Sequence, residues 1–254
     1  MSSAWPTKTL SEVCEIKPPK SEARQRLASN DSVSFVPMED LGIDQKQVVP
    51  TQTRLLADVA GSYTYFADGD VLLAKITPCF ENGKLGIAAN LTNGVGFGSS
   101  EYMVLRPSPA LDKEWLYYYL SRETFRTEGA ARMSGAVGHK RVAKEFIDAY
   151  PIPVPPLTEQ QRIAGILDEA FDGIATAKAN AEKNLQNARA LFESHLQAVF
   201  TQRGDGWVDR QLESLCDQIT VGHVGSMATR YKDDGIPFLR SQNIRPFEVC
   251  LDNV

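Results

Sequence analysis

Cysteine and histidine are scarce in this chain and never stand close together. The 254-residue sequence holds four cysteines and three histidines, and no two cysteines form a Cys-x-x-Cys pair. A zinc site needs such closely spaced ligands, so we expect no metal site. Scattered cysteines are typical of reduced, buried thiols in a cytoplasmic protein. The residues are Cys14, Cys79, Cys216, Cys250, His139, His195 and His223.

Long hydrophobic runs are also missing. No segment approaches about 18 apolar residues, and the first residues lack the charged-then-apolar pattern of a signal peptide. We therefore expect a cytoplasmic protein that neither crosses a membrane nor is secreted. Its 43% hydrophobic and 23% charged residues are ordinary for a chain that buries one or two cores.

Catalytic motifs are not found either. The sequence contains no Asn-Pro-Pro-Tyr or Asp-Pro-Pro-Tyr segment of an adenine methyltransferase, no phosphate-binding Gly-x-x-x-x-Gly-Lys-Ser/Thr loop and no Gly-x-Ser-x-Gly elbow. We expect a non-enzymatic chain with no catalytic residues and no cofactor of its own.

An overall excess of positive charge is lacking. The net charge is −5 and the isoelectric point about 5.3, whereas an independent DNA-binding domain usually carries an excess of basic residues that neutralises phosphates. The charge is unevenly spread. Residues 122–145 contain six basic and three acidic residues, whereas residues 159–200 contain four basic and six acidic residues. The chain alone is expected to bind DNA weakly, with larger partners sharing the phosphate contacts.

One long uninterrupted helical pattern stands out. Prolines at 151, 153, 155 and 156 predict an extended segment. Thr158 and Gln161 then form the Thr-x-x-Gln pattern of a capping box, and Glu159 places negative charge in the first turn. No proline follows before Phe200. The sequence predicts a helix over residues 158–200, about 60 Å long.

The apolar residues of this helix recur at intervals of three and four, close to a heptad repeat. A helix this long exceeds the needs of a compact domain, so the stripe predicts pairing with another long helix. The alternative is an amphipathic helix lying on its own domain. The predicted helix-pairing residues are Ile163, Leu167, Ala170, Ile174, Ala177, Ala181, Leu185, Ala188 and Leu191, and the stripe continues to His195 and Val199.

The sequence starts to repeat itself after about 200 residues. Trp5–Cys14 aligns with Trp207–Cys216, and after a one-residue gap residues 34–41 match residues 237–244 in apolar pattern. Such a period is that of a whole domain plus a spacer rather than of a solenoid unit. We expect a second copy of the first domain to begin here and to remain incomplete.

The first part of the chain mixes strand and helix signals. Residues 8–14 favour a short helix or strand, Asn82-Gly83 is typical of a hairpin turn, and residues 113–122 show amphipathic helical spacing with an aromatic cluster expected in the core. Strands are predicted at residues 33–37, 70–76, 84–88 and 102–106. The predicted fold class is α+β: a mixed α/β domain followed by one long coiled-coil-forming helix.

Together these features resemble the specificity subunit of Type I restriction-modification enzymes. Residues 152–163, in which Pro-Pro-Leu runs through Thr-Glu-Gln-Gln-Arg to Ile, look like the junction between domain and spacer in that family. Asp68–Lys75 is similar to its Gly-Asp strand. The resemblance implies a target-recognition domain over residues 1–157, a helical spacer over 158–200 and the start of a second, incomplete recognition domain over 201–254.

The resemblance implies sequence-specific recognition of a bipartite double-stranded DNA target. Separate modification (methyltransferase) and restriction or motor subunits would bind S-adenosylmethionine, ATP and Mg. The single spacer predicts an antiparallel homodimer through the helices. Two alternatives remain: a coiled-coil scaffold without sequence-specific DNA binding, and a recognition domain fused to a methyltransferase, whose motifs this chain lacks.

Two loops are the candidate reading surface. Residues 75–84 combine lysines with hydrogen-bonding turn residues, and residues 132–141 combine two glycines with bases and a histidine. We favour the second, because similar glycine-containing loops precede the junction in the family. Alternatively, both are merely solvated loops. The predicted DNA-binding residues are Lys75, Thr77, Asn82, Lys84, Arg132, Ser134, Gly135, His139, Lys140, Arg141 and Lys144.

Overall fold

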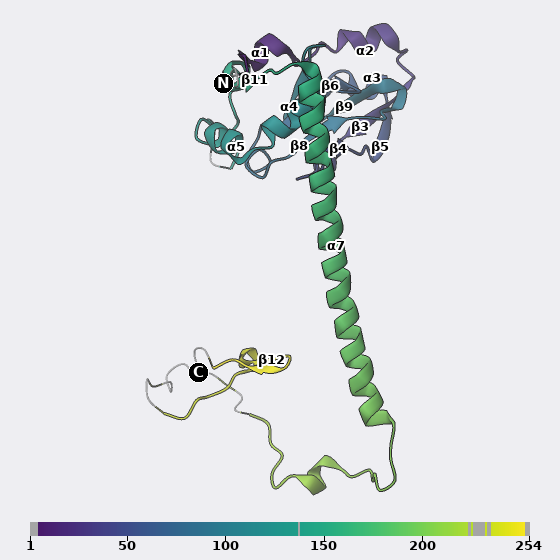
Figure 1. The fold of residues 1–254 in the computed structure, drawn as a ribbon, viewed down its shortest axis with the longest axis vertical. Coiled ribbons are helices and arrows are strands. Elements are labelled where there is room, and N and C mark those ends of the chain that lie inside the picture. Colours follow the sequence, from purple (N-terminus) through teal and green to yellow (C-terminus); the bar gives the residue numbers. More distant parts are fainter. Residues whose placement is uncertain (1–4, 137, 223–224, 226–231, 233–234, 252–254) are drawn as a thin grey trace. The chain divides into compact units, whose positions relative to one another are not determined.

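The computed structural model describes residues 5–136, 138–222, 225, 232 and 235–251. The chain divides into two compact units, Met1–Gln186 and Asn187–Val254. Figure 1 gives the order of their elements, and each unit is described by itself.

A five-stranded sheet lies at the centre of the first unit, with strand order β2-β10-β7-β8-β4. All neighbouring pairs are antiparallel except β4 and β8. Alternate residues of β7 face two different cores, since Leu73 contacts one cluster and Leu72 another. The sheet is therefore buried on both faces. Its strands are β2 (Cys14–Ile16), β4 (Gln47–Val48), β7 (Val71–Ala74), β8 (Leu85–Ala88) and β10 (Tyr102–Pro107).

A second, four-stranded sheet packs against the first, with strand order β5-β3-β9-β6. Phe66 and Val36 of this sheet share a core with Leu72 and Val104 of the other. Gly96 leaves room for the Phe66 ring, because a Cβ there would lie 2.1 Å from a ring carbon. The strands are β3 (Ser32–Val36), β5 (Gln52–Leu55), β6 (Thr64–Ala67) and β9 (Val95–Gly98).

Short helices cover the outer faces of both sheets. The largest core joins one face of the five-stranded sheet to Trp115, Leu116 and Phe125. A smaller core places Ala23 and Val59 on the four-stranded sheet. The helices are α1 (Leu10–Val13), α2 (Ser21–Arg26), α3 (Leu56–Val59), α4 (Lys113–Leu120), α5 (Glu123–Ala130) and α6 (Lys144–Ala149), with 3-10 turns η1 (Met38–Asp40) and η2 (Thr92–Gly94).

Most predicted strands are confirmed, but the Asn82-Gly83 hairpin is wrong. β7 ends at Ala74 and β8 begins at Leu85, so ten residues connect them. Phe80 explains the longer connection, because its buried ring packs against Phe125 and draws the loop towards α5. Gly83 still makes a tight local turn at φ 79°.

The proline-rich segment enters the long helix through a strand, as predicted. β11 (Pro151–Pro153) pairs antiparallel with β1 (Thr7–Thr9). Helix α7 then runs from Leu157 to Thr201, 45 residues or about 67 Å. Within the first unit, residues 172–186 of this helix are all exposed, so this stretch does not lie against the sheets. The long helix is confirmed, and Figure 1 shows it leaving the sheets of the first unit.

The predicted N-cap of this helix is wrong. Leu157 is already helical, so Thr158 lies inside the first turn. The Pro156 carbonyl accepts from the backbone N–H groups of Glu159 and Gln160, at 2.8 and 3.1 Å. The helix therefore starts at the proline pair, where tertiary contacts rather than a threonine hydroxyl fix the first turn.

The second unit repeats short elements of the first at the aligned positions. The 3-10 turn η3 (Leu212–Leu215) stands where the alignment places α1, and η4 (Ser241–Asn243) stands where it places η1. β12 (Ile244–Arg245) and β13 (Glu248–Val249) follow as a small hairpin. Short helical turns thus recur at two aligned positions, and the second recognition domain itself stays a prediction.

Candidate nucleic-acid interface

The two loops predicted from the sequence meet at one edge of the five-stranded sheet. The backbone N–H of Thr77 donates to the carbonyl of Lys140 at 3.0 Å, and that of Val142 donates to the carbonyl of Lys75 at 2.9 Å. Ile76 and Arg141 form an antiparallel bridge between them. Residues 75–84, 132–136 and 138–141, here called the interface loops, therefore form one surface.

The second interface loop is a small closed hairpin. Ser134 and Arg141 exchange backbone hydrogen bonds of 3.1 and 2.8 Å, and the N–H of His139 donates to the carbonyl of Ala136 at 2.9 Å. Gly135 adopts φ 126°, and a Cβ there would lie 2.9 Å from the carbonyl oxygen of His139. The glycine that sequence reasoning selected is thus needed for the closed loop.

Several predicted DNA-binding side chains are engaged within the protein. Lys75 Nζ donates to the Ser100 carbonyl and Lys84 Nζ to the Met38 carbonyl, at 3.0 and 2.8 Å. The remaining engaged side chains, with their contacts, are Thr77 (Lys140 carbonyl), Arg132 (Glu128 carbonyl and Phe146 ring), Arg141 (Glu101 carboxylate) and Lys144 (Asp148 carboxylate). These residues shape and order the surface.

Four predicted side chains point to solvent without such contacts. Asn82, Ser134, His139 and Lys140 are exposed, and among the described residues their side chains have no hydrogen-bond or ion-pair partner. They offer amide, hydroxyl, imidazole and ammonium groups, which suit hydrogen bonding to base edges or phosphate. These four are the candidate reading residues.

An acidic residue missed by sequence reasoning organises the charges of this edge. Glu101, directly before β10, accepts two hydrogen bonds from Arg141, at 2.6 and 2.9 Å. Those bonds lower the pKa of Glu101, so the pair is charged at neutral pH. Burial lowers the pKa of the neighbouring Lys75, and the charges of Lys17 and Arg141 lower it further. The two loops carry five basic side chains, and Glu81 and Glu101 are the carboxylates among and beside them, so the surface keeps a net positive charge.

The start of α7 is held by one buried amide. Gln160 Nε2 donates to the Pro155 and Ala110 carbonyls at 2.7 and 3.0 Å, and its Oε1 accepts from the Asp112 N–H at 2.8 Å. The side chain is fully buried. The junction pattern contained Gln160, but the pattern did not reveal its contacts with the loop before α4.

A polar cluster fixes the next turns of α7 to the domain. Asp168 accepts hydrogen bonds from Lys46 and Tyr118, and Lys46 also contacts Glu114 at 3.4 Å. Phe171 stacks on Tyr118, with ring centroids 5.7 Å apart and planes 12° apart. Residues Lys46, Glu114, Tyr118 and Asp168 are here called the helix-root clasp.

Electrostatics favour the charged form of this clasp. Burial opposes ionisation of Asp168, but the bonds from Lys46 and Tyr118 outweigh it and hold the pKa of the carboxyl below its usual value. Burial alone would lower the pKa of Lys46, and contact with Asp168 and Glu114 raises it instead. Sequence reasoning missed the clasp, because its members come from three distant segments.

The predicted helix-pairing stripe divides into two parts. Ile163 packs on the main core of the domain, and Leu167 lines a concave apolar site of about 430 Å³ with Trp115, Tyr118 and Phe171. Ile163 therefore packs on its own domain, Leu167 borders an open concavity, and the pairing of the stripe with another helix stays a prediction. The other predicted residues, Ala170, Ile174, Ala177, Ala181, Leu185, Ala188 and Leu191, are exposed.

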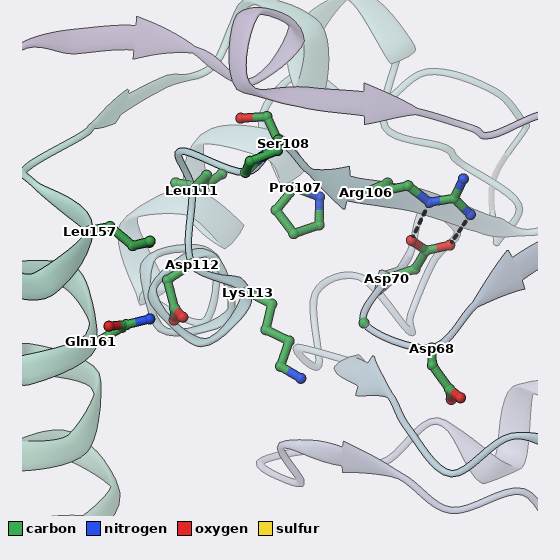
Figure 2. Close-up of a pocket in the computed structure, with 12 residues that line it drawn as sticks. Asp68, Asp70, Arg106, Pro107, Ser108, Leu111, Asp112, Lys113, Leu157 and Gln161 are labelled. Carbon is green, nitrogen blue, oxygen red and sulfur yellow. Dashed lines mark hydrogen bonds and ion pairs between the residues drawn. The ribbon is translucent and has the colours of Figure 1, made fainter. Parts of the chain in front are cut away.

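A second concavity, of about 360 Å³, lies between β10 and the start of α7 (Figure 2). Figure 2 shows Arg106 clamped on Asp70 by two hydrogen bonds, which measure 2.8 and 2.9 Å. Arg106 also contacts Glu22 at 2.7 Å, and Asp112 caps α4 through the N–H groups of Glu114 and Trp115. These groups serve the fold, and we assign this concavity no ligand.

Comparison with known proteins places the chain in a family. The family described as "Type I restriction modification DNA specificity domain" matches residues 2–186, more than half of the sequence. The chain belongs to this family. The suspected resemblance is therefore confirmed, and the matched region contains both interface loops and the start of α7.

Two curated relatives of this specificity-domain family come from Escherichia coli. The Type I restriction enzyme EcoEI specificity subunit is 40% identical over 162 residues, covering 63% of this chain and 27% of the relative. The EcoAI specificity subunit is 38% identical over 160 residues, covering 63% and 26%. The chain thus spans about a quarter of the length of these relatives.

A solved structure shares the fold. A chain from a study entitled "Structural basis underlying complex assembly and conformational transition of the type I R-M system" matches with a TM-score of 0.57 and 24% identity. The match covers 81% of this chain and 47% of that one. A mixed α/β domain followed by a long helix is therefore the fold of this chain, as predicted.

The described residues offer neither a metal-binding cluster nor a membrane-spanning helix. No group of three His, Cys, Asp or Glu side chains among them could hold a metal ion. Within the same residues, no helix is both long and apolar enough to span a membrane.

Proposed function

We propose that this chain reads part of a bipartite double-stranded DNA target as the specificity component of a Type I restriction-modification complex. The meeting of the two interface loops at one sheet edge carries the proposal. It gathers the exposed reading side chains of Asn82, Ser134, His139 and Lys140 on an ordered, positively charged surface. Amide and basic side chains of this kind distinguish the edges of the DNA bases in the major groove.

The long helix has a separate role in this proposal. Gln160 and the helix-root clasp hold its first turns on the domain, and its exposed length of α-helix provides a stiff connection. Half-sites one turn of DNA apart lie roughly 34 Å from each other, a distance that α7 can span. The helix would set the separation between this recognition domain and a second one.

The chemistry would belong to other subunits. We propose that this chain is non-catalytic, and that modification subunits bind S-adenosylmethionine while restriction or motor subunits bind ATP with Mg. The named relatives are specificity subunits of restriction enzymes, which supports this division of labour. A cytoplasmic location follows from such a role.

Helix pairing is part of the same proposal. Exposed Ile174, Leu185 and Leu191 lie along α7. Covering this stripe with a second α7 in antiparallel orientation would remove apolar surface from water. Light scattering at tens of micromolar should give a dimer mass, and a strict monomer would contradict this part.

Selection of bound DNA tests the main proposal. The chain is mixed with its modification subunit and a pool of randomised duplexes, and the retained DNA is sequenced. A defined consensus is the expected outcome. Weak binding without sequence preference would instead favour the coiled-coil scaffold.

A further inference from the structure

A row of three cations extends the interface beyond the two loops. Lys17 follows β2, and its backbone N–H donates to the Val104 carbonyl at 2.8 Å. Pro18 and Pro19 lead to Lys20, which precedes α2, and Arg24 lies in that helix. Lys17 and Arg24 are exposed and Lys20 is half-buried. Lys17, Lys20 and Arg24 are here called the basic ridge.

The sheet joins this ridge to the interface loops. β10 pairs with β2 on one side and with β7 on the other. The N–H of Lys17 donates to the Val104 carbonyl in β10, and the N–H of Lys75 donates to the carbonyl of Glu101, directly before β10, at 3.0 Å. Three residues along a strand correspond to about 10 Å. The ridge therefore begins near the interface loops at Lys17 and continues along β10 towards its far end, where Glu22 of α2 contacts Arg106.

Two ridge side chains are ordered by backbone contacts. Lys20 Nζ donates to the Gly61 carbonyl at 2.7 Å, and Arg24 donates to the Ala60 carbonyl at 3.2 Å. Each group keeps further N–H donors for another acceptor. An anion would thus meet cations that have already lost part of their conformational freedom.

Carboxylates in the described residues do not neutralise the ridge. Glu22, in α2 itself, is engaged by Arg106 at 2.7 Å and by the Tyr65 hydroxyl at 3.1 Å. Burial lowers the pKa of Lys20, and repulsion by Arg24 and Lys17 lowers it further. Neighbouring like charges without a counterion are relieved by an external anion.

We propose that the basic ridge binds the phosphate backbone of the DNA whose bases face the interface loops. The inference rests on the proposed function and adds to it a surface that fixes the position of the duplex without reading its sequence. Lysine suits this role, because its ammonium group is a compact point charge that binds phosphate without the planar geometry of base recognition.

Salt-dependent binding tests the ridge in the complex with the modification subunit. Affinities for the selected target and for a scrambled duplex are measured between 50 and 200 mM salt, roughly the range in which phosphate contacts dominate the salt effect. The ridge variant carries Lys17→Gln, Lys20→Gln and Arg24→Gln. The control carries Lys178→Gln, Lys183→Gln and Arg189→Gln, which remove the same charge from exposed positions of α7.

Each phosphate contact contributes about 0.9 to the slope of log affinity against log salt. Loss of all three should reduce the slope by up to about 2.7 and weaken both duplexes by the same factor. The control should keep the wild-type slope. A wild-type slope in the ridge variant, or weakening of the selected target alone, would overturn the inference.

A single substitution distinguishes the loss of a phosphate contact from misfolding of the triple variant. The Lys17 side chain has no hydrogen-bond or ion-pair partner among the described residues, so Lys17→Gln should leave the fold intact and reduce the slope by about 0.9. Lys17→Arg should restore it. If the wild-type complex shows no preference for any sequence, the proposed function fails; if preference exists but Lys17→Gln keeps the full slope, only the ridge fails.

Discussion

Replacing Asp168 with alanine should loosen α7 from the domain. Asp168 accepts the hydrogen bonds of both Lys46 and Tyr118. A hydrogen bond to a charged group contributes about 1.5–3 kcal/mol when buried. Since the Lys46 and Asp168 side chains remain 24% and 28% exposed, water recovers part of this, and we expect a cost of about 1–2 kcal/mol.

Such a cost changes the docking equilibrium by a factor of about 5–30. An undocked population of about 1% would rise to between about 5% and 25%. Alanine also favours helix formation over aspartate, so α7 itself should remain helical. The substitution therefore separates docking of the helix from its formation.

Pulsed electron–electron double resonance between two spin labels detects undocking of α7 from the domain. Spin labels are placed at Thr124→Cys and Asn180→Cys, both exposed and both in the first unit, with Cys79 and Cys216 replaced by serine. The unaltered clasp should give one narrow distance distribution, and Asp168→Ala should add a second, broader component.

A matched control is available on the same helix. Glu159 pairs with Arg162 at 2.8 Å, within α7 and away from the clasp. Glu159→Ala removes one carboxylate and should leave the distribution narrow. An unchanged distribution in Asp168→Ala, or equal broadening in both variants, would refute the reasoning.

Further predictions concern the pH dependence of the helix-root clasp, the contacts of Gln160 at the start of α7, the hairpin of the second interface loop, and self-association. Because the pKa of Asp168 is held below its usual value of about 4, the clasp is intact above that pH and lost as pH falls through the lowered pKa; the wild-type distance distribution should broaden in acid, whereas that of Asp168→Ala should not change further. Gln160→Leu leaves three backbone groups without their partner, of which the Pro155 carbonyl is buried, and should cost about 1–3 kcal/mol in urea unfolding, whereas exposed Gln161→Leu should cost about 0.5 kcal/mol or less; equal costs would disprove the role of Gln160. Gly135→Ala strains the hairpin by about 1–3 kcal/mol and should weaken DNA binding in the complex at least tenfold, unlike Ala136→Gly. Leu185→Glu should give a monomer by light scattering if exposed α7 residues pair, and a persistent dimer would place the contact elsewhere.

Local signals predicted the long helix and most strands of the first unit. The helix was expected at residues 158–200 and spans Leu157–Thr201, because apolar periodicity without proline is a strong signal. The start of the helix was missed, since the Pro156 carbonyl and the tertiary contacts of Gln160 define it. The hairpin at Asn82-Gly83 failed for a similar reason, as burial of Phe80 outweighed a local turn preference.

Long-range pairing determined what the sequence did not reveal about the site. Both interface loops were recognised as candidates, but their contact depends on the bridge between Ile76 and Arg141. Lys17 and Glu101 are far from the loops in the sequence, and only the strand order β2-β10-β7 brings them close to Lys75. Several of the predicted basic residues, Arg141 and Lys84 among them, donate hydrogen bonds to acceptors within the protein. Composition cannot distinguish such side chains from free ones.

The central claim is that the exposed side chains of the interface loops read DNA bases. The most direct measurement compares the DNA consensus selected by the wild-type complex with that selected by a complex carrying His139→Ala and Lys140→Ala. We expect a consensus that changes at a few neighbouring positions in one half of the target and is retained in the other. An identical consensus in both complexes would contradict it.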